Sequence, residues 1–184
     1  MAGAIPTMGD VERQFFERAL AAPRTPDSHF DLYGPLLSML SSIFKSRPRS
    51  SYLITPPYRA QLNKDPIELE GGGALTTACF VIVKFPRKNL VQVMGLHIQR
   101  GDETVPAARA RVARFLRQKA GEDRVPNLCS ILLLGNDVEV YSLTDGSSDA
   151  KISDDVMRFS NPAGPELKAL LYKIAEENFE EYEV

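Results

Sequence analysis

The sequence lacks the signals that direct a chain into a membrane or out of the cell. It contains only two cysteines in 184 residues, and both lie in apolar runs, where a thiol behaves as a small hydrophobic side chain. The first residues have neither the basic nor the apolar stretch of a secretory signal. No apolar run reaches the roughly eighteen residues that a membrane span needs. We therefore expect an intracellular protein, cytoplasmic or nuclear, with no membrane partner.

The chain also lacks an excess of positive charge. Its net charge of −2 at pH 7 argues against a protein that coats nucleic acid indiscriminately. The charge is nevertheless uneven, because Lys and Arg outnumber Asp and Glu between residues 84 and 124, whereas the last residues are rich in glutamate. The basic middle is therefore the part to inspect for anion binding.

Apolar periodicity predicts an alternation of helices and strands. Helices are predicted at 10–22, 35–44, 104–121 and 165–182, and strands at 51–55, 79–85, 90–99, 130–134 and 138–143. A helix between two buried apolar strands favours an α/β fold with a mixed central sheet flanked by helices. We expect one domain over residues 1–184, with a core of about 30–143 to which the helices at 10–22 and 165–182 are additions.

The strand from 138 to 143 alternates apolar and polar residues, which predicts that it is half exposed. The helix after Thr104 is predicted to place Ala108, Val112, Phe115 and Leu116 in one apolar stripe, with Thr104 as its cap. Three glycines at 71–73 lack the Lys-Ser/Thr of a phosphate-binding loop and are interpreted as a hinge.

In the order of its elements, αβββαβ followed by a further hairpin strand, the chain resembles the PD-(D/E)XK, or restriction-endonuclease-like, superfamily of nucleases. In that family the second strand opens with an Asp and the third carries Glu-x-Lys before the crossover helix. The corresponding positions here hold Cys79, His97 and Gln99. The resemblance implies the fold of a metal-dependent phosphodiesterase with a degenerate active site.

The chemistry of these three positions argues against nuclease activity. Mg²⁺ requires hard oxygen ligands, and a thiol and an imidazole are poor substitutes. Gln99 would orient a water molecule but would not supply the positive charge of a lysine. We therefore expect no catalytic residues, no cofactor and no metal. The alternative is an active enzyme that holds Mg²⁺ with migrated acids, for which Glu68, Glu70 and Asp102 are the candidates.

His97 also has interpretations that do not depend on the resemblance. In an apolar strand a histidine is more often part of the core than a ligand. A zinc site would need Cys79 and His97 together with Cys129 and His29, which are not at zinc-site spacing. A Cys79 nucleophile with His97 as its base has no third group to orient it.

The basic residues in the middle of the chain allow two interpretations. They form either the solvated face of an amphipathic helix or a set of contacts to nucleic-acid phosphates. The candidates for phosphate contacts are Lys84, Arg87, Lys88, Arg100, Arg109, Arg111, Arg114 and Arg117.

The sequence thus favours a catalytically inactive, nuclease-like binding or assembly module whose partner is nucleic acid or protein. Two alternatives stay open. One is the active Mg²⁺-dependent phosphodiesterase, and the other is a protein-only interaction domain or homodimer that uses exposed apolar positions of the terminal helices.

Overall fold

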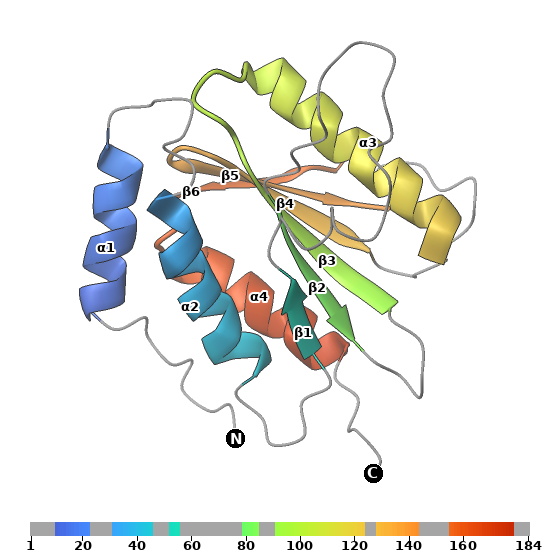
Figure 1. Ribbon diagram of the computed structural model, residues 1–184, viewed down its shortest axis with the longest axis horizontal. Coiled ribbons are helices and arrows are strands. Elements are labelled where there is room, and N and C mark those ends of the chain that lie inside the picture. The colour runs from blue at the N-terminus through green and yellow to red at the C-terminus, as the bar shows by residue number, and fades with distance from the viewer. Residues whose placement is uncertain are drawn as a thin grey trace.

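A mixed β-sheet lies between two unequal layers of helix. The computed structural model describes residues 10–22, 31–45, 52–55, 79–84, 91–123, 128–143 and 155–178. Helices α1 (Asp10–Ala21), α2 (Tyr33–Phe44) and α4 (Pro165–Glu177) cover one face of the sheet, and α3 (Val105–Asp123) covers the other (Figure 1). None of the helices in this part of the chain is long and apolar enough to cross a membrane. The predicted α/β fold with a mixed sheet between helices is confirmed.

Within the described residues, six strands form one sheet in sequence order. They are β1 (Tyr52–Thr55), β2 (Cys79–Lys84), β3 (Val91–Ile98), β4 (Cys129–Leu134), β5 (Asp137–Ser142) and β6 (Met157–Ser160). The first three are antiparallel neighbours, β4 runs parallel to β3 after the crossover through α3, and β5 and β6 continue antiparallel. Both predicted hairpins, β2 with β3 and β4 with β5, are therefore present. Gly135, at φ 66°, makes the turn of the second one.

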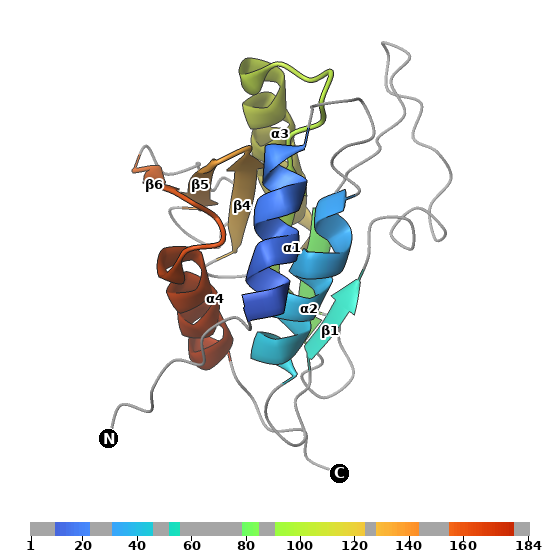
Figure 2. The ribbon, with the colours of Figure 1, turned by 90° about the vertical axis from the view of Figure 1, so that its left-hand side faces the viewer.

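The sequence-based expectations were wrong at two places in the C-terminal third of the sheet. The strand β6 was not predicted at all. Its presence also overturns the prediction of a half-exposed β5, since Val138, Glu139, Val140 and Tyr141 are all buried. The reason is that β6 pairs along one edge of β5, while helices lie over both faces of the sheet, as the view turned by 90° shows (Figure 2).

The sheet separates two apolar cores. The larger one lies under α1, α2 and α4 and includes Phe16, Leu40, Phe80 and Leu171. The smaller one lies under α3 and contains the predicted stripe of Ala108, Val112, Phe115 and Leu116. Burial of these side chains removes apolar surface from water on both faces, which is the main favourable term in folding.

Candidate functional site

Residues opposite one another on five neighbouring strands form a row across the sheet. The register pairs Cys79 with His97, His97 with Leu132, Leu132 with Glu139 and Glu139 with Arg158. Directly opposite residues share a face of the sheet, and Leu132 belongs to the core under α3. The row therefore lies on the α3 face, with Cys79 and His97 at one end.

His97 is fully buried beneath α3. Its ring packs edge-to-face against Phe115, with 4.7 Å between the ring centroids. Gly95 makes room for this packing, because a Cβ atom at that position would lie 2.6 Å from Cε1 of Phe115. The interpretation of His97 as a core histidine thus fits its surroundings.

Arg111 lies beside this histidine and is itself fixed on all sides. Its Nη1 is 3.5 Å from Nδ1 of His97, and its Nη2 donates a hydrogen bond to the backbone oxygen of Ile98 at 3.0 Å. The guanidinium also makes a two-pronged pair with Glu103, through Nε at 2.9 Å and Nη2 at 2.8 Å. We call His97, Glu103, Arg111 and Phe115 the Arg111 cluster.

The electrostatics of the Arg111 cluster keep the histidine neutral. Burial, and then the charge of Arg111, lower the pKa of His97 from 6.5 to about 3. Burial alone would raise the pKa of Glu103, but the hydrogen bond and the charge of Arg111 outweigh it and bring that pKa below its ordinary value. The cluster therefore holds a neutral imidazole and a closed ion pair of which the two side chains are only 11% and 7% exposed.

The residues that follow β3 close the connection to α3. Gln99, at the lysine position of the resemblance, donates from its side chain to the backbone oxygen of Glu103 at 2.7 Å. The backbone N–H of Arg100 donates to the Glu103 carboxylate at 3.3 Å. Asp102 is exposed in the turn, and Thr104 accepts a backbone N–H from the first turn of α3 in its predicted role as cap. The side chain of Gln99 thus stabilises the loop between β3 and α3.

A second polar cluster lies at the other end of the row and is centred on Glu139. This carboxylate accepts hydrogen bonds from Arg109, Arg158 and the hydroxyl of Tyr141. These bonds, that of Arg109 foremost, lower the pKa of Glu139 to about 2. Burial and then Glu139 raise the pKa of Tyr141 to about 12. We call these four residues the Glu139 cluster.

The arginines of α3 thus divide into three kinds. Arg111 is buried against Glu103, and Arg109 lies on the opposite flank of the helix, bound to Glu139. Arg114 and Arg117 are exposed, and the described residues provide neither of them with a hydrogen bond or ion pair. Of the predicted phosphate contacts on this helix, therefore, Arg111 is turned inward and three others reach the surface.

For several of the predicted site residues the structure describes no side chain. Glu68, Glu70, Arg87 and Lys88 fall outside the described residues. Cys79 and Lys84 are placed only by the backbone of β2. Among the described residues, no three His, Cys, Asp or Glu side chains come close enough together to hold a metal ion.

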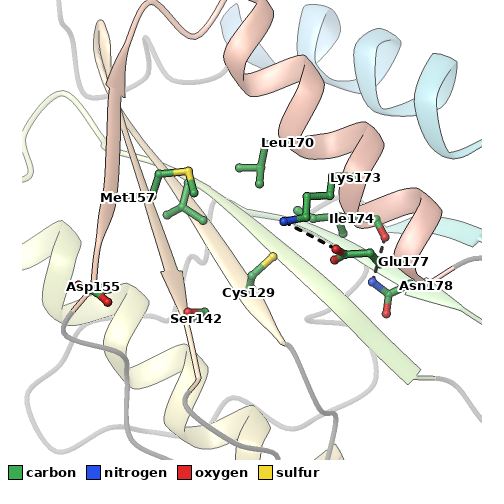
Figure 3. A pocket seen from close by; sticks show the side chains of 10 residues that line it. Cys129, Ser142, Asp155, Met157, Leu170, Lys173, Ile174, Glu177 and Asn178 are labelled. Carbon is green, nitrogen blue, oxygen red and sulfur yellow. Dashed lines mark hydrogen bonds and ion pairs between the residues drawn. The ribbon is translucent and has the colours of Figure 1, made fainter. Parts of the chain in front are cut away.

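A pocket of about 190 Å³ opens between α4 and the end of the sheet (Figure 3). Its wall combines apolar side chains such as Met157 and Leu170 with the exposed Lys173–Glu177 pair. Cys129 lies at its inner wall, but burial and then the charge of Glu177 raise its pKa to about 12. A thiol with so high a pKa is protonated and is a weak nucleophile.

Sequence reasoning missed the residues of the Glu139 cluster other than Arg109. Glu139 and Tyr141 stand two apart in a strand, which places them on the same face, and this spacing was the available signal. Arg158 could not be found from such a signal, because its strand was not predicted.

Comparison of the chain with protein-family models, curated proteins and solved structures finds no match.

Proposed function

We propose that this chain is a PD-(D/E)XK-like domain without catalytic activity that binds the sugar–phosphate backbone of nucleic acid, in the cytoplasm or nucleus. The proposal is supported by the meander of β1, β2 and β3 and by the α3 crossover to a parallel β4, which is the element order of the resemblance. The observation that carries it is the state of the Arg111 cluster at the position of the family's active site.

A divalent cation needs two or more oxygen ligands and room for water. At the position of the family's Glu, His97 is instead buried and neutral, and a guanidinium already lies 3.5 Å from it. The carboxylate of Glu103, two residues before α3, already accepts hydrogen bonds from Arg111 on both of its oxygens. A metal ion there would face an existing positive charge in a closed core.

The outer surface of α3 carries exposed arginines. From Val105 to Gly121 the helix contains no Asp or Glu, and Arg114 and Arg117 project from it into solvent. Arg109 and Arg158 are also 45% and 62% exposed. Arg109 and Arg158 are paired with Glu139, whereas Arg114 and Arg117 have no ion pair with the described residues. Exposed arginines contact phosphates and release condensed counterions.

Binding to fluorescently labelled single-stranded DNA, double-stranded DNA and RNA, measured by anisotropy over a salt series, tests the binding half of the proposal. We expect the affinity to fall steeply with salt and to depend little on base sequence. The double variant Arg114→Gln/Arg117→Gln should reduce the salt slope by about 0.9 for each bond to a phosphate that the substitutions remove. The double variant Arg13→Gln/Arg18→Gln, an equal change of charge on α1 across the sheet, should leave the slope unchanged.

Incubation of the same labelled nucleic acids with Mg²⁺ or Mn²⁺ tests the catalytic half. We expect no cleavage. Cleavage that disappears in Glu70→Ala would contradict the proposal and establish the alternative enzyme with migrated acids. A protein that binds no nucleic acid at low salt, but forms dimers by light scattering, would instead establish the protein-only alternative.

A further inference from the structure

The Glu139 cluster has the construction of a binding site rather than of a simple surface ion pair. Its parts come from three elements, since Arg109 belongs to α3, Glu139 and Tyr141 to β5, and Arg158 to β6. Arg158 stands directly opposite Glu139 in the register. The carboxylate is only 3% exposed, whereas both arginines reach solvent.

Both oxygens of the Glu139 carboxylate accept two hydrogen bonds each. One oxygen accepts Nε of Arg109 at 2.9 Å and the hydroxyl of Tyr141, and the other accepts Nη2 of Arg109 and Nε of Arg158, the latter at 3.0 Å. Four donors fill the lone pairs of both oxygens. Because two guanidinium groups share one oxygen, they are held side by side.

Each of the two arginines has donors that the Glu139 carboxylate does not use. Among the described residues, Arg158 is bound only through Nε, so that both of its Nη atoms are left for another acceptor. Arg109 is bound through Nε and Nη2, which leaves Nη1. Two arginines and one glutamate give this site a net charge of +1, which one phosphodiester group would neutralise.

We propose that Glu139 fixes Arg109 and Arg158 as a clamp that seats one phosphodiester group of a nucleic-acid strand. The inference rests on the proposed function and goes beyond it, because it assigns one fixed contact among several arginines. Arg114 and Arg117, which lack such support, supply charge without fixed geometry. Glu139 is a positioning residue that does not touch the ligand.

The substitution Arg158→Lys tests the clamp at constant charge. A lysine lacks the planar fork of donors that pairs with both a carboxylate and a phosphate. We expect the affinity for a labelled oligonucleotide to fall about tenfold while the salt slope stays the same. Arg13→Lys on α1 is the matched control and should bind as the unaltered protein does.

Glu139→Gln separates positioning from simple electrostatics. The variant is more positive by one unit, so that a diffuse basic surface would bind nucleic acid more tightly. The clamp predicts weaker binding, since an amide cannot accept from both arginines and the hydroxyl. Circular dichroism of the variant must match that of the unaltered protein; if the variant does not fold, Arg158→Lys alone decides.

The outcomes distinguish this inference from the function on which it rests. If the unaltered protein binds no oligonucleotide, the proposed function fails. If it binds, but Arg158→Lys binds equally well or Glu139→Gln binds more tightly, the clamp is wrong and the proposed function stands. Polyglutamate is a further competitor of the labelled oligonucleotide. If it competes as well as an unlabelled oligonucleotide of equal charge, the site is not specific for a phosphodiester group and the clamp is wrong.

Discussion

The two faces of the sheet are stabilised in different ways. The face under α1, α2 and α4 is lined by buried apolar side chains, and its buried hydroxyl, that of Tyr52, bonds to the backbone of α4. The α3 face holds His97, Ser130 and Glu139, three of the four buried polar residues among those described. Both faces thus have an apolar core, but on the second face ion pairs on both flanks of α3 also fix that helix.

This difference matters because apolar packing and ion pairs respond differently to substitution. Hydrophobic interactions are not directional, so a helix held by them tolerates small shifts. A buried ion pair is directional, and removal of one partner leaves an unpaired charge in the core. The α3 face should therefore be the one on which single polar changes have large effects.

The largest effect is expected for Arg111→Met. This change leaves the Glu103 carboxylate buried without its partner, and we expect the free energy of unfolding in urea to fall by about 3 kcal/mol. The double variant Arg111→Met/Glu103→Gln should recover part of this loss, because it removes both charges. A loss no larger than that of Arg13→Met on the other face would show that the pair is not structurally important.

The next largest effect is expected for Gly95→Ala. The added Cβ atom would lie 2.6 Å from the ring of Phe115, and overpacking at a buried position costs about 2 kcal/mol. Gly34→Ala on α2 is the matched control, because nothing lies within 4 Å of its added atom. That variant should be no less stable than the original, since alanine has the higher helix propensity. Equal stability of the two variants in urea would contradict the packing of Phe115 over β3.

A pH titration of stability probes the same face. The pKa of His97 is about 3 in the fold, against 6.5 ordinarily, so that the unfolded chain binds more protons between these values and stability falls as pH falls. The full contribution is present above pH 6.5, and we expect a loss of about 2 kcal/mol between pH 7.5 and 5. Glu103 and Glu139, with lowered pKa values, add to the loss only below their ordinary range.

His97→Gln is the variant that isolates this contribution. It retains a polar side chain at the position but removes the titration, so its unfolding free energy should change much less over the same pH interval. Parallel curves for the two proteins would show that His97 is already protonated or exposed in the fold.

The features that were predicted correctly are those that leave a regular spacing of apolar residues in the sequence. The stripe of Ala108, Val112, Phe115 and Leu116 is buried as expected, because one-sided burial of a helix leaves a 3.6-residue repeat. The hairpins of β2 with β3 and of β4 with β5 followed from apolar runs around turn residues. The α/β class and the mixed sheet followed from the order of these elements.

The sequence did not predict interactions that depend on distant partners. Glu139 lies in a strand that was predicted to be half exposed, yet the side chain is buried. Its partners Arg109 and Arg158 lie 30 and 19 residues away in the sequence. Arg111 was grouped with the candidate phosphate contacts, because its bonds to Glu103 and to the backbone oxygen of Ile98 form only in the fold. The strand β6 has four residues without a buried alternation, so no local pattern marks it.

The smallest effect on stability is expected within the Glu139 cluster. Its arginines are exposed to solvent, whereas Arg111 at the other end of the α3 face is buried. Arg158→Ala removes a side chain that is 62% exposed, and Glu139 keeps Arg109 and Tyr141, so we expect a loss of about 0.5 kcal/mol. Arg109→Ala removes two hydrogen bonds and should cost about 1.5 kcal/mol. Thermal unfolding of both variants at pH 7 measures this order. A loss at Arg158 as large as at Arg111 would mean that β6 and its arginine belong to the structural core, and that the two ends of the polar row do not differ in kind.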